Sequence, residues 1–290
     1  MMEIRTARTC EAAQEQALWL QVFGDPQTYI QCYYDTCYAP EDVHVLLEDG
    51  RIVSMLICLP VALCLPGGST GRGAYIYALA TAPAARGRGL AHRLLAFTHA
   101  HLRAQALDLA VTVPAMDSLF GFFQTAGFAP FFYTREQRFA RADLPPATGR
   151  AEVCSAEAYH HHRQAFRFAQ PSVVYPAAQI LWQKRVSTLA RADLYRIPLG
   201  TAAAFAAAEY ADAQTLVLKE LLAPAAQTAQ ALANLVGSLP AHTCVVRMPL
   251  CATAQPAPAE RFGMVAWYNA ALAQEARAHT APGYLGLAFD

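Results

Sequence analysis

The strongest constraint on the fold is a glycine-punctuated turn, Ala82-Pro83-Ala84-Ala85-Arg86-Gly87-Arg88-Gly89-Leu90-Ala91. An apolar stretch ends just before it at Thr81, and leucines recur at helical spacing after it, so the sequence predicts a strand, a turn and a helix. Glycines let the backbone curl so that successive N–H groups point inward, and the helix adds the positive end of its dipole. The turn therefore either binds a phosphate-like anion or is a plain connection that carries two solvated arginines, Arg86 and Arg88.

Composition and charge exclude several classes of protein. The 290 residues are 55% hydrophobic and 15% charged, which is ample for a core and long enough for two domains of ~100–200 residues. Because 22 Lys and Arg balance 22 Asp and Glu, no electrostatic reason exists for binding a nucleic acid, and we expect no such partner. The consecutive histidines 160–162 point in different directions on a helix, so we expect no metal site.

Cysteine usage and the N-terminus favour a cytoplasmic protein. The eight cysteines form no C-x-x-C pair and are interpreted as reduced thiols, and the start Met-Met-Glu-Ile-Arg lacks the order of a signal peptide. Residues 52–71 are uncharged, but prolines and glycines interrupt them, so two buried strands are a better interpretation than a membrane span. We therefore expect no membrane association.

Hydrophobic periodicity divides the chain into two α/β regions. Residues 1–45 are expected to form two helices, followed by three strands at 43–47, 52–59 and 74–81. A helix from about 90 to 102 and a strand at 107–113 come next. A short helix ended by Gly127 and a long strand or hairpin at 128–139 complete this region. The best linker is 141–149, which contains two prolines and a glycine. Beyond it, a strand at 215–221, a helix at 224–235 and a strand at 243–248 repeat the βαβ order without a glycine-rich turn. We expect domains at 1–140 and 150–290, each with a mixed central sheet flanked by helices.

The turn carries a family resemblance. Arg86-x-x-Gly89-x-Ala91, between a strand and an amphipathic helix, resembles the R/Q-x-x-G-x-G/A acetyl-coenzyme A signature of the GNAT N-acetyltransferase superfamily. Residues 75–81 match that family's cofactor-pairing strand, and residues 119–128 match its helix that ends in Gly-Phe. The resemblance spans residues 1 to about 140 and implies an α/β (α+β) fold. The whole chain loosely resembles the tandem enhanced-intracellular-survival acetyltransferases, with residues 150–290 as a degenerate GNAT-like domain that lacks the cofactor loop.

The resemblance implies an acetyl-coenzyme A site and a primary amine acceptor, either a small molecule or a peptide. The backbone N–H groups of the turn would hold the pyrophosphate, Arg86 would shape the loop, and the strand would pair with the pantetheine arm, while the next strand would splay from it near Val113. Such a site needs no metal. The implied cofactor-binding residues are Leu79, Ala80, Thr81, Arg86, Gly87, Arg88, Gly89, Leu90, Ala91 and Val113.

One departure from the family concerns catalysis. The family's tyrosine acid stands four residues before the glycine of Gly-Phe, and this chain has Phe123 there. Phenyl cannot donate a proton, so another group supplies it, the thiolate leaves unassisted, or catalysis is weak. A thiolate with a pKa near 8.5 is a tolerable leaving group at neutral pH, so loss of the acid need not end activity.

The general base is also unassigned, because no carboxylate stands on the strand at 75–81. Tyr75, Tyr77 and Asp117 are candidates for catalysis, and Asp25 is a candidate for amine recognition, although each also suits capping or hydrogen bonding. The expected function is N-acetyl transfer from acetyl-coenzyme A to a primary amine. The alternatives are a non-catalytic coenzyme A-binding protein and, using the same turn, a nucleotide-binding domain. The acceptor and the oligomeric state are left open by the sequence.

Overall fold

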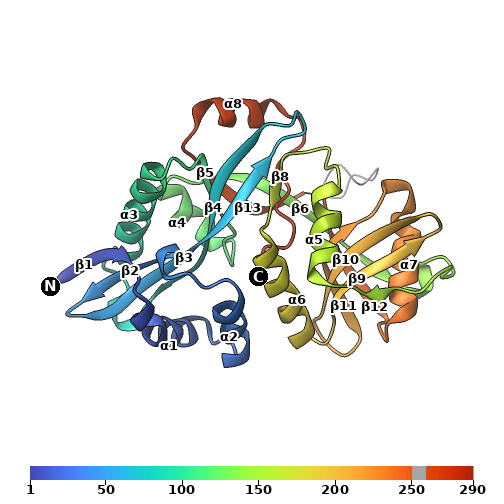
Figure 1. Ribbon diagram of the computed structural model, residues 1–290, viewed down its shortest axis with the longest axis horizontal. Helices are drawn as coiled ribbons and strands as arrows, with labels where there is room; N and C mark the ends of the chain where they lie inside the picture. The colour runs from blue at the N-terminus through green and yellow to red at the C-terminus, as the bar shows by residue number, and fades with distance from the viewer. Residues whose placement is uncertain (250–258, 290) are drawn as a thin grey trace. The chain divides into compact units, whose positions relative to one another are not determined.

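The computed structural model describes residues 1–249 and 259–289 of the chain (Figure 1). The chain divides into two compact units, one made of residues 1–131 and 262–278 and the other of residues 132–261 and 279–290. The structure thus draws the division differently from the expected boundary at 140–150. The long strand after Gly127 already belongs mostly to the second unit, and a segment near the C-terminus belongs to the first.

The first unit contains a mixed sheet in the order β1-β2-β3-β4-β5-β13. Strands β1 to β4 are antiparallel, β4 and β5 are parallel, and β13 is antiparallel to β5. The strands are β1 (Met2–Thr6), β2 (Val43–Glu48), β3 (Arg51–Cys64), β4 (Thr70–Thr81), β5 (Leu109–Thr112) and β13 (Glu260–Trp267). The helices are α1 (Ala12–Phe23), α2 (Gln27–Thr36), α3 (Leu90–Ala104), α4 (Ser118–Thr125) and α8 (Ala270–Ala278).

Side-chain alternation along the strands places helices on both faces of this sheet. Leu56 of β3 and Ile76 of β4 share a core with leucines of α3 and phenylalanines of α4. The neighbouring residue Tyr77 points to the other face, where its ring lies 5.6 Å from that of Trp19 in α1. Both faces are therefore buried, which accounts for the long apolar run of β3.

Strand β13 completes the first unit from a distant part of the sequence. Met264 stands opposite Thr112 and Trp267 opposite Leu109, so β13 covers the outer edge of β5. Met264 and Ala266 are buried in the core that contains α3 and α4. No local pattern in residues 1–140 indicates this strand, because its partner lies some 150 residues away in the sequence.

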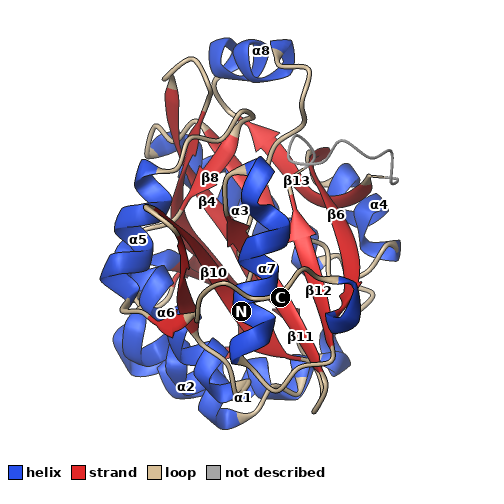
Figure 2. Ribbon diagram, turned by 90° about the vertical axis from the view of Figure 1, so that its right-hand side faces the viewer, coloured by secondary structure: helices blue, strands red, loops and turns tan. Residues whose placement is uncertain are grey.

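The second unit contains a sheet in the order β6-β12-β11-β10-β9-β7. Its parallel pair β11 and β12 is joined by α7, whose leucines pack on alternating residues of the sheet; Figure 2 shows α7 over these strands. The strands of this sheet are β6 (Ala129–Ala140), β7 (Glu152–Val153), β9 (Leu194–Leu199), β10 (Ala202–Tyr210), β11 (Thr215–Leu222) and β12 (Thr243–Met248), and the short strand β8 (Ser172–Val174) lies outside this order. The helices are α5 (Ala156–Ala165), α6 (Ala177–Leu189) and α7 (Thr228–Ser238).

Several expected elements are confirmed and others are wrong. The strands expected near 43–47, 74–81, 215–221 and 243–248 are present, and 128–139 is a single long strand, β6. Residues 2–6 form strand β1 rather than part of a helical region. Residues 52–71 hold most of one strand, β3, and only the start of β4. The strand β3 continues through Pro60, which stands opposite Ala74 of β4, beyond Ile57, the partner of the first residue of β2.

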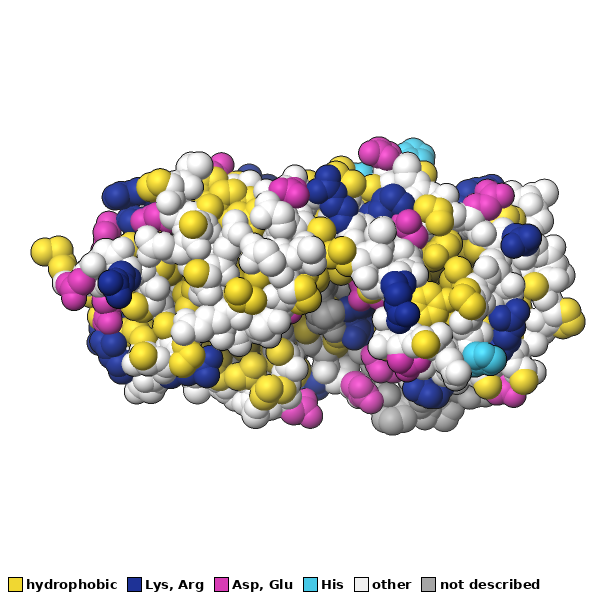
Figure 3. Space-filling model, turned by 90° about the horizontal axis from the view of Figure 1, so that it is seen from below, with side chains coloured by type: hydrophobic (Ala, Val, Ile, Leu, Met, Phe, Trp, Pro, Cys, Tyr) yellow, Lys and Arg dark blue, Asp and Glu magenta, His cyan; other side chains and the backbone are white. Residues whose placement is uncertain are grey.

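Four further features concern the surface charge, the length of the helices, the cysteines and His160. Figure 3 shows acidic and basic side chains interspersed over the face in view. Among the described helices, none is long and apolar enough to cross a bilayer. The described cysteines are free thiols, while Cys251 lies outside the described residues. His160 lies in α5, where its Nε2 is 3.1 Å from the carbonyl oxygen of Tyr175.

Candidate active site

A cavity of about 440 Å³ opens beside the glycine-rich turn in the first unit. Strand β4, the turn, the first turn of α3, the end of α1 and one face of α4 form its walls. The lining residues are Val22, Leu79, Thr81, Ala85, Arg86, Gly87, Gly89, Leu90, Ala91, His92, Leu119, Phe122 and Phe123.

The turn has the backbone shape that an anion site requires. Gly87 and Gly89 have φ values of +75° and +72°, in the left-handed region that favours glycine, and Gly89 is the N-cap of α3. A Cβ atom built on either glycine would meet nothing within 4 Å, so the space in front of the turn is open. Within the described residues, the N–H groups from Gly87 to Ala91 have no hydrogen-bond acceptor. Free N–H groups at a helix N-terminus facing an open cavity suit a phosphate oxygen.

The two arginines of the turn have different surroundings. The Nε of Arg86 donates to the carbonyl oxygen of Thr81 at 3.2 Å, so Arg86 closes the loop onto the end of β4 and still lines the cavity. The guanidinium of Arg88 donates two hydrogen bonds to the Glu48 carboxylate of β2, with N···O distances of 2.9 and 2.5 Å. The Arg88 side chain is thus bound to β2 and does not line the cavity, so only the backbone of Arg88 remains available to a bound anion.

A bulge in β4 brings the strand backbone to the cavity. Met55 pairs with Ala80 and Ile57 with Tyr77, so β4 has one residue more than β3 between these pairs. The bulge lies at Ala78, which has a φ of +48°. A positive φ is uncommon for a residue with a side chain. Leu79, the next residue, lines the cavity. The Thr81 hydroxyl is 2.9 Å from that of Ser54, which also donates to the Ala80 carbonyl and fixes the end of the strand.

The ladder between β4 and β5 ends where the family resemblance implies a splay. The last parallel pair is Ile76 with Thr112, reinforced by the Thr112 hydroxyl, which donates to the Ile76 carbonyl at 3.1 Å. Val113 follows without a partner on β4 in this register and is half-buried. The backbone of β4 beyond Ile76 is therefore not paired with β5.

Helix α4 supplies an apolar wall. Leu119, Phe122 and Phe123 lie at helical spacing and line the cavity together. Phe123 is 6% exposed, and its ring meets those of Phe122 and Phe128 edge-on at 5.1 and 5.7 Å. Among the cavity-lining residues in the described chain, none carries a carboxylate.

The candidates for catalysis and amine recognition lie outside the cavity lining. The hydroxyls of Tyr77 and Tyr29 are 2.9 Å apart, and burial raises the pKa of Tyr77 well above its usual range, so it stays protonated at neutral pH. Tyr75 is buried beside Tyr77, with ring centroids 5.9 Å apart. The Asp25 carboxylate accepts a hydrogen bond from the Trp19 indole at 2.7 Å. Asp117 is exposed at the N-cap of α4, and its side chain makes no capping bond.

Sequence reasoning missed part of the lining. Val22 in the last turn of α1 and His92 in the first turn of α3 both face the cavity. His92 also lies 2.8 Å from the Thr125 hydroxyl and 4.5 Å from the Phe122 ring. The spacing of Leu119, Phe122 and Phe123 indicates one helix face from sequence, but nothing local indicates that this face looks toward the turn.

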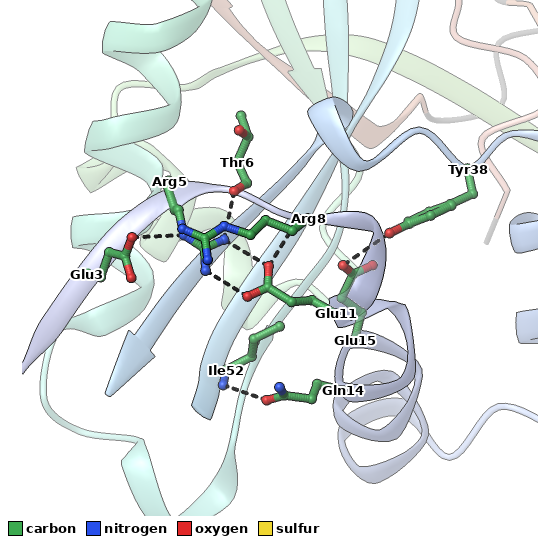
Figure 4. A network of polar contacts seen from close by, with 9 residues as sticks. All are labelled: Glu3, Arg5, Thr6, Arg8, Glu11, Gln14, Glu15, Tyr38 and Ile52. Atoms are coloured by element: carbon green, nitrogen blue, oxygen red, sulfur yellow. Dashed lines mark hydrogen bonds and ion pairs between the residues drawn. The ribbon is translucent and has the colours of Figure 1, made fainter. Parts of the chain in front are cut away.

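Glu15 of α1 carries a buried carboxyl and stands seven residues, about two helical turns, before Val22, so the two residues share one face of the helix. Figure 4 shows Glu15 beside Tyr38, with Arg5 directed to Glu11. Glu15 is fully buried and accepts hydrogen bonds from Tyr34 and Tyr38 at 3.0 and 3.3 Å. The Arg5 guanidinium does not neutralise Glu15, because it donates two hydrogen bonds to the Glu11 carboxylate, with N···O distances of 2.6 and 2.8 Å. Burial therefore raises the pKa of Glu15 to about 7, against the smaller lowering by the two tyrosine hydroxyls.

Comparison with known proteins gives the family and the fold. Residues 3–131 match the family model of the acetyltransferase (GNAT) domain. The fold is similar to that of Eis1 from Mycobacterium abscessus, with a TM-score of 0.67 and 15% identity over 92% of this chain and 73% of that one. It is also similar to a GCN5-related N-acetyltransferase from Anabaena variabilis, with a TM-score of 0.70 and 17% identity over 91% of this chain and 72% of that one.

A probable N-acyltransferase of unknown function from Enterococcus faecalis has the same TM-score of 0.70, at 17% identity over 93% of this chain and 73% of that one. No curated protein sequence matches the chain significantly. At these identities the structural similarity shows the fold, while the family model shows the kind of chemistry.

The family match supports transfer of an acyl group from acyl-coenzyme A, with acetyl-coenzyme A or coenzyme A as the cofactor. The residues around the cavity fit that group, because free N–H groups and open space meet at the N-terminus of α3. The signature turn, the bulged β4 and the unpaired end of β5 all lie within the matched residues. Residues 3–131 therefore match the acetyltransferase (GNAT) domain, and the fold of the chain is similar to that of Eis1.

Proposed function

We propose that this protein transfers the acetyl group of acetyl-coenzyme A to a primary amine of a small molecule or peptide. The observation that carries the proposal is the set of unpaired N–H groups from Gly87 to Ala91 at the start of α3, in a turn that borders an open cavity. These groups would hold the pyrophosphate. Leu79, Ala80 and Thr81 would pair with the pantetheine arm along β4, where β5 no longer pairs.

Acetyl-coenzyme A would supply a thioester carbonyl that the amine attacks, so that a C–N bond forms, the C–S bond breaks and the thiol is released. The chain would contribute orientation and exclusion of water. The β4 bulge and the apolar wall of Leu119, Phe122 and Phe123 border the cavity beside the turn. Since no lining residue in the described chain carries a carboxylate, the amine proton would pass to water or to a group outside this lining.

The amine-recognition side is proposed to lie at the α1–α2 junction. Asp25 stands there with one carboxylate oxygen bonded to Trp19, beside the hydroxyl pair of Tyr29 and Tyr77. A carboxylate surrounded by aromatic rings suits a protonated amine. Tyr75, Tyr77 and Asp117 remain proposals for catalytic roles.

A second candidate function has a specific observation in its favour. Phe123 stands in the wall where the family has its tyrosine acid, and it brings no hydroxyl to the cavity. A coenzyme A-binding protein without turnover, acting as a sensor or scaffold, needs the turn but not the acid. Release of free thiol with a panel of primary amines separates this candidate from the enzyme.

The second unit is proposed to be a GNAT-like domain without a cofactor loop, so that one coenzyme A binds per chain. Its βαβ unit passes from β11 to α7 through Pro224 and the short 3-10 turn Ala225–Gln227, with no glycine between them. That connection lacks the left-handed glycines that open the turn before α3.

Calorimetric titration with coenzyme A tests the site. The Gly89→Glu variant places a carboxylate where the pyrophosphate is proposed to lie, and we expect the dissociation constant to rise by roughly a hundredfold. Gly68→Glu is the matched control, since Gly68 also has a positive φ and open surroundings but lies between β3 and β4. Unchanged affinity in folded Gly89→Glu removes the site assignment, and two molecules bound per chain contradicts the interpretation of the second unit.

A further inference from the structure

Two histidines of α3 hold the C-terminal end of α4. His92 and His99 are seven residues apart, about two helical turns, and therefore lie on one face of α3. The Nε2 of His92 lies 2.8 Å from the Thr125 hydroxyl, and the Nε2 of His99 lies 3.0 Å from the Ala126 carbonyl oxygen. Thr125 and Ala126 are consecutive residues at the end of α4, so this end is tied to α3 twice.

The surroundings of His99 define its protonation. A carbonyl oxygen only accepts, so the Nε2 of His99 carries the hydrogen in its bond to Ala126. Burial, together with the positive charge of Arg103, lowers the pKa of His99 and keeps the ring neutral. The Nδ1 then accepts a hydrogen bond from the Tyr268 hydroxyl at 2.6 Å. Arg103 lies over the Tyr268 ring at 4.7 Å, and Phe128 packs at 5.2 Å from the His99 ring.

The bond to Ala126 bears on the cavity through α4. The N–H groups of Ala126 and Phe128 both donate to the Phe123 carbonyl, at 3.1 and 3.0 Å. Ala126 is therefore linked directly to a residue of the cavity wall. A movement of this end displaces Phe122 and Phe123 with the last turn of α4, because the helix moves as a unit.

We propose that His99 is a positioning residue of the cofactor cavity, held in the Nε2–H tautomer between the Ala126 carbonyl and the Tyr268 hydroxyl, so that it fixes the end of α4 and the wall of Leu119, Phe122 and Phe123. The inference rests on the proposed function of this cavity. The positioning role of His99 also gives the segment 262–278 a function in the site, besides completing the sheet, because Tyr268 directly follows β13. Tyr268 is itself anchored there, since its N–H donates to the Asp108 carbonyl at 2.7 Å.

Two substitutions of His99 separate positioning from general stability. The amide nitrogen of glutamine comes close to the place of Nε2, whereas that of asparagine comes close to the place of Nδ1. His99→Gln thus keeps a donor for Ala126, and His99→Asn keeps only the contact with Tyr268. Tyr268→Phe removes the hydroxyl and leaves the ring under Arg103. His101→Gln serves as the control, because the His101 side chain bonds to Gln105 of its own helix segment and not to α4.

The test measures the coenzyme A dissociation constant by calorimetry, the thermal midpoint of each variant, and the ring-nitrogen spectrum of His99. We expect His99→Asn to bind about fivefold more weakly than wild type and His99→Gln to stay within about twofold, as loss of one hydrogen bond implies. Both should lose similar thermal stability. In wild type the spectrum should show an Nε2–H tautomer, and in Tyr268→Phe the Nδ1 resonance should shift, because this nitrogen loses the hydrogen bond from the hydroxyl.

Equal coenzyme A affinity in the Gln and Asn variants, with wild type binding normally, overturns the positioning role alone. An unchanged Nδ1 resonance in Tyr268→Phe overturns the role of the hydroxyl. If wild type itself fails to bind coenzyme A, the proposed function falls together with this inference.

Discussion

Replacing Glu15 with glutamine should stabilise the first unit at high pH. Glu15 is fully buried in α1, its carboxyl accepts hydrogen bonds from Tyr34 and Tyr38, and burial raises its pKa from the ordinary value of 4.5 to about 7. In the unfolded chain the carboxyl ionises near 4.5. Between these two values the folded state holds a proton that the unfolded state has lost, so the free energy of unfolding falls as pH rises.

The magnitude follows from the two pKa values. One pKa unit corresponds to about 1.36 kcal/mol, so a rise from 4.5 to about 7 corresponds to a loss of up to about 3 kcal/mol, complete above pH 7 and absent below 4.5. Glutamine has nearly the same shape, offers an oxygen to one tyrosine hydroxyl and an N–H to the other, and does not ionise. Glu15→Gln should therefore be more stable than wild type by up to about 3 kcal/mol at pH 8 and nearly equal to it at pH 4.5.

Denaturant unfolding at a series of pH values measures this difference. Glu275→Gln, an exposed glutamate of α8 in the same unit, is the control and should show almost no pH-dependent gain. A Glu15→Gln advantage that is the same at pH 5 and pH 8, or that grows toward low pH, would refute the assignment of a neutral buried carboxyl.

Two further predictions concern the cavity wall and the composition of the first unit. Phe123→Tyr adds one hydroxyl to a ring that already lines the cavity, so the fold and coenzyme A affinity should change little, while the rate of acetyl transfer should rise, up to ~10²–10⁴-fold if expulsion of the thiolate limits. A pH–rate profile from pH 6 to 9 with one amine checks this, and a rate at or below wild type throughout would mean that the acid is supplied elsewhere. A chain ended after residue 140 loses β13 and exposes the edge of β5, so it should unfold without a cooperative transition, whereas restoring residues 262–278 through a linker should recover it. Circular dichroism during heating measures the transition of the shortened chain and of the chain with residues 262–278 restored. A cooperative transition in the shorter chain would contradict a structural need for β13.

The local pattern of the sequence determined the turn and its immediate neighbours. A strand into Thr81, two glycines that adopt positive φ and a leucine-faced helix from Leu90 are all specified by adjacent residues, because turn chemistry and periodicity act over short distances. The same holds for the β11–α7–β12 unit, whereas for residues 128–139 the sequence left a long strand and a hairpin open and the structure shows one strand, β6. The resemblance to the family signature added the cofactor, which periodicity alone left open between phosphate-bearing ligands.

Tertiary structure decided what depends on distant parts of the chain. Strand β1 is short and only half-buried, so its apolar pattern is weak, and its pairing with β2 defines it. Strand β13 pairs with β5 from a distant part of the sequence, and no residue near β5 in the sequence indicates this pairing. The neutral carboxyl of Glu15 and the tautomer of His99 likewise arise from burial among groups remote in sequence. Strand pairing and desolvation are properties of residues that meet only after folding, which is why the sequence pattern could locate the turn but not the partners that complete the site around it.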